Sequence, residues 1–178
     1  AGSSYTVPDE LQFNTTYFWR IDELTADGTV TEGAVWRFTV GEFVNSDDFE
    51  TNDFSRFAWE SGGDLDWTVS STESHSGAYS AKAGAIGDEQ STTLTLRLDS
   101  LDGAITFWRK VSCENGFDRF EFSIDGVTKA QWTGELEWEE VSFPVEGGMR
   151  TFTWTYIKDS YVSSGADSAW IDDVVLPI

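Results

Sequence analysis

The sequence predicts an all-β protein whose larger part is an antiparallel jelly-roll β-sandwich. Polar and apolar residues alternate in segment after segment, as they do in strands that bury only one face. Turn-forming pairs separate these segments at intervals of about 8 to 12 residues, which is typical of sandwiches and jelly rolls. No window of a dozen residues combines apolar positions at helical spacing with a credible capping residue.

Three segments show the alternation most clearly. Residues 92–98 place three leucines on one face of a strand and the threonines with Arg97 on the other. Residues 117–124 and 151–157 repeat the pattern with aromatic side chains. The apolar faces of these three segments are formed by Leu94, Leu96, Leu98, Phe120, Phe122, Ile124, Phe152, Trp154 and Tyr156.

Turn signals agree with the strand pattern. The pairs that offer a residue tolerant of positive φ are Asp102-Gly103, Asn115-Gly116, Asp125-Gly126 and Gly147-Gly148. Asp125-Gly126 lies directly between residues 120–124 and 127–132 and gives the clearest hairpin. About eight strands fit between residues 44 and 176 on this spacing.

Composition restricts the partners of the protein. Thirty-two Asp and Glu residues against eleven Lys and Arg give a net charge of −21 in 178 residues. This field repels phosphate backbones and anionic headgroups, so nucleic acid and membrane surfaces are excluded as partners. No apolar stretch approaches the roughly 20 residues of a spanning helix, so no membrane insertion is expected. The first residues lack signal-peptide blocks, and we expect any export signal to have been removed or to lie outside this fragment.

The first 42 residues behave differently from the rest. Two strand-like runs, 15–22 and 34–40, enclose a polar stretch with Asp27-Gly28 and predict a hairpin. Leu11 followed six residues later by Tyr17 resembles the tyrosine corner in the last strands of a fibronectin type III domain. The family's first strands are missing. We therefore expect residues 1–42 to be the C-terminal part of a fibronectin III-like domain and residues 43–178 to be the jelly roll.

The larger part carries an ordered set of landmarks. They are Asp47-Asp48-Phe49-Glu50, Trp67, residues 74–81, residues 105–108, Asp125-Gly126, Trp138, residues 152–154 and residues 170–174. This order resembles MAM-like and cleaved-adhesin jelly-roll modules of secreted bacterial multidomain proteins and, more distantly, calcium-bearing jelly-roll carbohydrate-binding modules. The paired cysteines of animal MAM domains are missing. The resemblance implies a non-catalytic adhesion or binding module attached to other domains.

A calcium site is the sharpest expectation about chemistry. A jelly roll brings its first and last strands side by side, and here both carry acidic residues, with Asp48 and Glu50 at one end and Asp172 and Asp173 at the other. The resemblance implies that Glu50 and Asp172 bind a structural calcium, with backbone carbonyls of the Ser76-Gly77 turn as further ligands. Strand register decides which of Asp172 and Asp173 points inward. The alternative is that these acids are solvated surface residues.

Nine tryptophans also permit a sugar-binding interpretation, because flat rings stack on the apolar faces of pyranoses. Most of them are expected in the core, namely Trp67, Trp108, Trp138, Trp154 and Trp170. Trp132 at the end of a hairpin strand and Trp59 in a turn-rich stretch are the candidates for ligand contact. Either ring could equally cover a hydrophobic edge.

A polar cluster around Arg109, Asp118 and Tyr161 is the last candidate, either as a recognition surface or as ordinary exposed ion pairs. Catalysis is not expected. No phosphate-binding glycine loop occurs, and Cys113 and His75 are the single residues of their kinds, which also excludes a disulfide framework and a Cys/His zinc site.

These expectations combine into one interpretation. The chain is a calcium-stabilised, non-catalytic adhesion or carbohydrate-binding module, secreted or displayed on a cell surface. Its partners are then an extracellular glycan or cell-surface protein and neighbouring modules of the same polypeptide. The alternative is a structural stalk or filament module in which strands of one chain complete the sheet of a neighbour.

Overall fold

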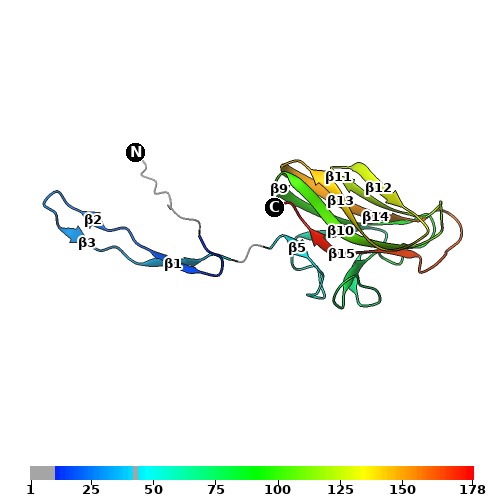
Figure 1. Cartoon of the computed structure of the whole chain (residues 1–178), viewed down its shortest axis with the longest axis horizontal. Helices are drawn as coiled ribbons and strands as arrows, with labels where there is room; N and C mark the ends of the chain where they lie inside the picture. Colours follow the sequence, from blue (N-terminus) through cyan, green and yellow to red (C-terminus); the bar gives the residue numbers. More distant parts are fainter. Residues whose placement is uncertain (1–10, 42–43) are drawn as a thin grey trace. The chain divides into compact units, whose positions relative to one another are not determined.

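The chain is an all-β protein, as the sequence predicts. The computed structural model describes residues 11–41 and 44–178. Within these residues all the regular secondary structure consists of β-strands (Figure 1). None of these residues forms a helix long and apolar enough to cross a membrane. The chain divides into two compact units, Ala1–Val44 and Asn45–Ile178. The expected boundary between residues 42 and 43 lies outside the described residues.

The first unit consists of short antiparallel pairs. Strand β1 (Thr16–Trp19) pairs with β4 (Trp36–Thr39), and β2 (Glu23–Leu24) pairs with β3 (Val30–Thr31). The Tyr17 hydroxyl accepts a hydrogen bond from the Gln12 backbone N–H at 2.8 Å. A tyrosine corner makes a contact of this kind, with a backbone group a few residues upstream. The fibronectin III assignment of this unit stays a prediction that this hydrogen bond favours.

The second unit is a sandwich of two antiparallel sheets. One sheet has the strand order β13-β10-β15-β8-β7, with β5 paired to β15, and the other has the order β12-β11-β14-β9-β6. The strands are β5 (Ser46–Asp47), β6 (Trp59–Gly63), β7 (Thr68–Ser70), β8 (Ser80–Lys82), β9 (Ser91–Ser100), β10 (Gly103–Ser112), β11 (Arg119–Ile124), β12 (Val127–Trp132), β13 (Glu135–Val145), β14 (Gly148–Ile157) and β15 (Ser168–Val175). Short strands such as β5, β7 and β8 raise the number above the eight expected.

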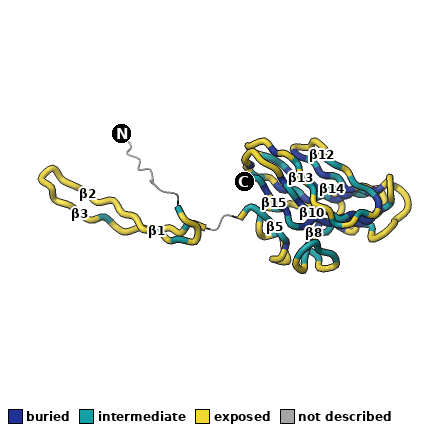
Figure 2. Tube along the Cα trace, in the orientation of Figure 1, coloured by how far each residue is buried: buried dark blue, intermediate teal, exposed yellow. Residues whose placement is uncertain are grey.

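The core lies between the two sheets, where the buried stretches of Figure 2 are found. The predicted apolar faces are confirmed, because the inward residues of β9, β11 and β14 are buried except for Leu98, which is half-buried against the core. The hairpin at Asp125-Gly126 is confirmed as well. Both residues have positive φ, 52° and 74°, as the type I′ turn of a two-residue hairpin requires.

The core prediction is right for some tryptophans and wrong for others. Trp67 and Trp154 belong to the core. Trp170 is buried, but the Lys82 ammonium lies over its ring, 5.5 Å from the centroid. Trp108 and Trp138 are only half-buried. Trp108 is paired with Asp172 across β10 and β15 and follows the core residue Phe107, so the alternation of the strand turns it to the outer face.

Candidate functional site

The first and last strands of the second unit lie side by side. Val174 of β15 pairs with Asp47 of β5. The Asp47 carboxylate is fully buried, accepts the Trp59 indole N–H at 2.8 Å and the Phe49 backbone N–H at 2.9 Å, and has its pKa raised by this burial. We call this junction the seam, defined by residues 46–50 and 172–175. The seam places the acidic segments from both ends of the unit together.

Two carboxylates from the seam hold one loop between β7 and β8. Glu50 Oε1 accepts the backbone N–H groups of Ala78 and Tyr79 at 2.8 and 2.9 Å. Asp172 Oδ2 accepts those of His75 and Ser76 at 2.8 and 3.2 Å. Residues 75–79 are therefore fixed by one acid from each end of the second unit.

The two neighbouring aspartates have different environments. Asp172 is 0% exposed, and burial raises its pKa to about 6. Asp173 is half-buried and accepts the Ser76 hydroxyl at 2.9 Å, while its Oδ2 lies 2.7 Å from His75 Nδ1. The His75 ring stacks on Trp108 with centroids 3.5 Å apart. Of the two aspartates, Asp172 is therefore the one whose carboxylate water does not reach.

Two residues of the seam have a strained backbone. Phe49 and Asp173 have φ of 55° and 46°, although neither is a glycine. Such conformations cost of order 1–3 kcal/mol each and concentrate at ligand clamps and functional sites.

The chemistry of the seam fits a hard cation in part. Glu50 Oε2 has no hydrogen-bond partner among the described residues, whereas Oε1 accepts two backbone N–H groups of the loop. A Cβ at Gly77 would lie 2.4 Å from Glu50 Oε1, so only glycine leaves room for the carboxylate. Asp48, in contrast, pairs with Arg56 at 3.3 Å. The acids of the seam do not place three carboxylate oxygens within 4.8 Å of one another.

A different acidic cluster does so. Glu114, Asp118 and Asp159 place one ligand oxygen each within 4.8 Å of one another, and this is the one such group in residues 11–41 and 44–178. Burial raises the pKa of Asp118 and of Glu114. This cluster could hold a metal ion. The sequence singled out Asp118 as a ligand contact, not as a metal ligand.

Replacing Gly77 by alanine tests the clamp on the 75–79 loop. Gly77 has φ of +56°, and the added methyl group would displace the Glu50 carboxylate. We expect urea denaturation to show a loss of about 1–3 kcal/mol in the free energy of unfolding. The matched control is Gly116→Ala, because Gly116 has φ of +84° with open space around it. Equal losses in the two variants would show that the Glu50 contact contributes nothing.

A surface hollow at the open end of the β11–β12 hairpin, away from its turn, brings together two of the expected ligand residues. It has a volume of about 300 Å³. Its lining consists of Gly116, Phe117, Asp118, Arg119, Gln131, Trp132 and Thr133. Trp132 and Asp118 were both expected as ligand contacts, and the structure brings them to one place.

The Trp132 ring is supported from within. Its centroid lies 5.5 Å from that of Phe120 and 5.4 Å from the Arg109 guanidinium carbon. Arg109 is only 4% exposed and donates to the Glu137 carbonyl oxygen at 3.0 Å. Arg109 and Asp118 are thus buried, which corrects the expectation of an exposed polar cluster. The inward alternation of β10 puts Arg109 there.

The other two expected ligand residues lie elsewhere. Trp59 of β6 is half-buried, packs on Trp154 with centroids 5.5 Å apart, and donates its indole N–H to Asp47. It covers an edge of the core, one of the two interpretations that the sequence left open. Tyr161 is 73% exposed in the loop between β14 and β15, and its backbone N–H donates to Asp159.

Sequence reasoning missed Phe117 and Gln131. Phe117 is 59% exposed although it is large and apolar, and it lines the hollow. Gln131 donates to Glu121 at 2.8 Å, and Arg119 also pairs with that carboxylate. The available signal was the position of Phe117 directly after Asn115-Gly116, where a turn carries an aromatic side chain outward.

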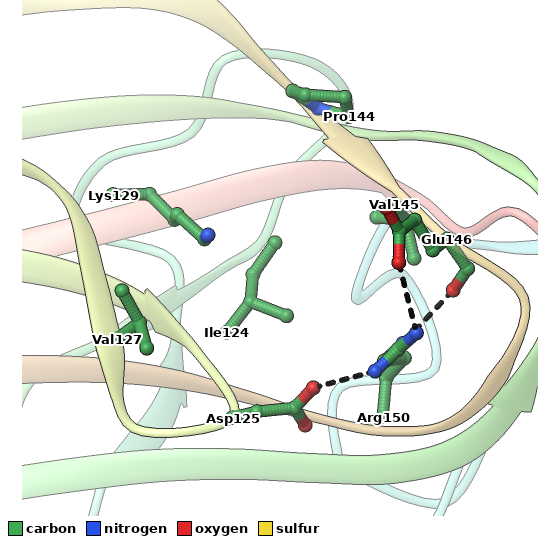
Figure 3. Close-up of a pocket in the computed structure, with 8 residues that line it drawn as sticks. All are labelled: Ile124, Asp125, Val127, Lys129, Pro144, Val145, Glu146 and Arg150. Carbon is green, nitrogen blue, oxygen red and sulfur yellow. Dashed lines mark hydrogen bonds and ion pairs between the residues drawn. The ribbon is translucent and has the colours of Figure 1, made fainter.

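A second hollow, of about 410 Å³, lies at the opposite end of the same hairpin (Figure 3). Arg150 is already engaged there, because it pairs with Asp125 at 3.0 Å and donates to the Glu146 carbonyl oxygen at 2.9 Å. Among the lining residues that Figure 3 draws, none is aromatic. It is the weaker candidate for a stacking ligand.

Comparison with known proteins gives structural neighbours only. No protein-family model and no curated protein sequence matches the chain. Among solved structures, TmCBM61 in complex with β-1,4-galactotriose superposes with a TM-score of 0.50 and 23% identity, covering 72% of this chain and 92% of that one. The K3 cleaved adhesin domain of Lys-gingipain from Porphyromonas gingivalis gives 0.56 and 14%, covering 73% and 95%.

A third neighbour is the C-terminal family 22 carbohydrate-binding module of Clostridium thermocellum Xyn10B. Its TM-score is 0.51 at 14% identity, with 75% of this chain and 92% of that one covered. These likenesses establish the fold as the jelly roll shared by cleaved adhesins and carbohydrate-binding modules. The resemblance noted in the sequence is confirmed at that level, whereas its MAM-like part stays a prediction.

Proposed function

We propose that this chain is a non-catalytic module that binds an extracellular glycan in the hollow beside Trp132. The observation that carries the proposal is the hollow itself, which combines two aromatic side chains with a preformed polar group. Trp132 is held by Phe120 and Arg109, so its ring needs little ordering on binding. Phe117 offers an exposed aromatic surface for the apolar face of a sugar ring.

The polar residues of the hollow suit sugar hydroxyls. Arg119 and Gln131 both bond to Glu121, so their donor groups are already oriented at the edge of the hollow. Binding sites of small ligands generally join apolar walls to a few placed polar groups. The jelly-roll neighbours support this role, and TmCBM61 in complex with β-1,4-galactotriose makes galactans a reasonable first probe.

Phe117→Ala is the variant that tests the hollow without disturbing the core. Because Phe117 is 59% exposed, we expect unchanged stability and a loss of glycan affinity of about tenfold, at the lower end of the roughly 1–3 kcal/mol that stacking of a nucleic-acid base on an aromatic side chain contributes. The measurement is retention on a polysaccharide array followed by calorimetry with the best ligand. Phe18→Ala, at 66% exposure in the first unit, is the control. Equal affinities in the two variants would remove the hollow from the proposal.

We also propose that calcium stabilises the seam through Glu50, Asp172 and Asp173, with backbone carbonyls of Ser76 and Gly77. The support is the burial of Asp172 and the room that Gly77 leaves beside the Glu50 carboxylate. A cation there would neutralise acids that otherwise repel each other. Asp48 is not included, because Arg56 already neutralises it.

Chelation tests the seam. A ligand bound only by the native state stabilises that state by mass action, so at 100 times the Kd calcium adds about 2.7 kcal/mol. We expect EDTA to lower the melting temperature and Glu50→Gln to shrink that response by at least half. Asp48→Asn serves as the control acid. A melting curve that ignores EDTA in the wild-type protein would exclude structural calcium.

The wider setting follows from the same proposal. A non-catalytic glycan-binding module of this kind would act in a secreted or surface-displayed protein, joined to neighbouring modules of its own polypeptide. The excess of acidic residues suits a saline exterior, where salt largely screens the repulsion between charges that lie more than about 10 Å apart. Localisation of the tagged full-length protein by cell fractionation would test this setting.

One observation favours a second function, as a structural module. Nine large apolar side chains between residues 11 and 41 are exposed, among them Ile21 at 72%, Leu24 at 73% and Trp36 at 58%. Patches of this kind mark surfaces that pack on a partner. If strand complementation joins copies of the chain, sedimentation velocity will show assemblies that grow with concentration. A monomer at all concentrations rules out the filament.

A further inference from the structure

We propose that Glu114, Asp118 and Asp159 form a second divalent-cation site, separate from the seam, that takes a calcium-like ion. The three residues come from two connections that meet at one end of the sandwich. Glu114 and Asp118 belong to the link between β10 and β11, and Asp159 belongs to the link between β14 and β15. The proposal does not depend on glycan binding.

The decisive observation is the state of Asp118. Its side chain is 0% exposed, its Oδ1 accepts the Asp159 backbone N–H at 2.9 Å, and its Oδ2 has no hydrogen-bond partner. Glu114 Oε2 is likewise buried without a partner. Leaving one buried acceptor unsatisfied costs about 1–3 kcal/mol, more when it is charged. Two such oxygens in one cluster indicate a ligand that the protein atoms do not supply.

Lysine does not satisfy these oxygens. The neighbouring cation is Lys158, which is buried and already pairs with Asp167, donates to Ser163 Oγ at 2.8 Å and lies 3.6 Å from Asp88. One ammonium group therefore faces four acids, Asp88, Asp167, Asp118 and Glu114, while Asp159 adds a further carboxylate beside the last two. A divalent ion would balance this surplus of negative charge.

The type of ion follows from the ligands. All three ligand atoms of the cluster are carboxylate oxygens, which hard cations prefer. The nearby Cys113 sulfur lies 3.6 Å from the Asp118 carbonyl oxygen and is not one of the cluster's ligand atoms. Soft metals would select thiolate, so calcium is the ion that this donor set suits best. Calcium would complete its coordination with backbone oxygens and water.

The consequence is structural. An ion shared by Glu114, Asp118 and Asp159 would tie together the two connections that carry Phe117 and Tyr161. The Glu89 N–H already donates to the Asp159 carbonyl oxygen at 2.7 Å, so the link between β8 and β9 would be joined to them. Three loops at one end of the sandwich would then depend on one ion.

Calorimetric titration of the metal-stripped chain with calcium tests the site. We expect Asp118→Asn and Glu114→Gln each to lose one equivalent of bound calcium relative to wild type. Glu50→Gln and Asp88→Asn should keep that equivalent, because neither residue belongs to the cluster. Glu114→Gln keeps the test valid if Asp118→Asn fails to fold. Glu114 is half-buried and its side chain accepts no hydrogen bond from the described residues, so its replacement should leave the fold intact.

Two results would overturn the site. One is an unchanged calcium stoichiometry in both variants, with circular dichroism like that of wild type. The other is a wild-type chain that binds no calcium beyond what Glu50→Gln removes. Neither result touches the glycan proposal, which the polysaccharide array measures separately.

Discussion

Trp154→Ala is expected to lower the free energy of unfolding by about 3–5 kcal/mol, the usual cost of removing a buried aromatic side chain. Trp154 is 0% exposed at the centre of the sandwich. Its ring lies 5.1 Å from that of Phe122, 5.4 Å from that of Phe107 and 5.5 Å from that of Trp59, measured between centroids. Truncation would therefore open a cavity bordered by both sheets. Urea denaturation with a two-state fit measures the loss.

Trp154→Phe is the matched control for this variant. The Trp154 indole N–H has no hydrogen-bond partner, so phenylalanine loses volume but no hydrogen bond. We expect it to retain most of the stability, with a loss of about 1–2 kcal/mol for the smaller ring. If the alanine variant were as stable as the phenylalanine variant, Trp154 would not lie in a close-packed core.

Acidification should stabilise the metal-free protein through Asp172. Burial raises the pKa of Asp172 from 3.8 to about 6, so between pH 4 and 6 the folded state binds more protons than the unfolded state. Stability then falls as the pH rises through this window, because ionising a buried carboxylate costs free energy. The contribution is about 2–3 kcal/mol at 1.36 kcal/mol per pKa unit. It is fully present below pH 4 and lost above about pH 6.

Asp172→Asn isolates this contribution from that of the other acids. The amide resembles the protonated acid, so the variant should show a flatter dependence of melting temperature on pH in EDTA than wild type. Saturating calcium should reverse the sign for the wild-type protein, because protons then compete with the ion for the carboxylate. Parallel pH profiles of the variant and wild type in EDTA would contradict the buried charge.

Much of the fold could be predicted because its long strands obey a simple period. The alternation in β9, β11 and β14 specified both the strand and its buried face, and Asp125-Gly126 specified the hairpin. The short strands β5 and β8 could not be found from this period, because two or three residues carry none, and the first strand was expected only from the jelly-roll resemblance. Trp108 and Trp138 were misplaced for a related reason, since an isolated aromatic residue does not reveal its face until the strand register is known.

The candidate sites were predictable where they depended on topology. The position of Asp172 beside residues 46–50 could be predicted, because a jelly roll places its first and last strands next to each other. The cluster of Glu114, Asp118 and Asp159 could not be predicted, because Asp159 stands 41 residues after Asp118 and only the packing of two loops brings them together. The burial of Arg109 was also beyond the sequence, because charged residues seldom face a core.

The proposed function requires a glycan to bind in the hollow beside Trp132. Nitrogen-15 NMR of the tryptophan indole N–H groups, recorded while the best array ligand is titrated, tests it most directly. We predict that the Trp132 signal shifts in proportion to saturation while those of Trp108 and Trp138 stay in place. A shift centred on Trp108 and Trp138, or no shift of any indole signal with the ligand bound, would show that the glycan does not bind in this hollow.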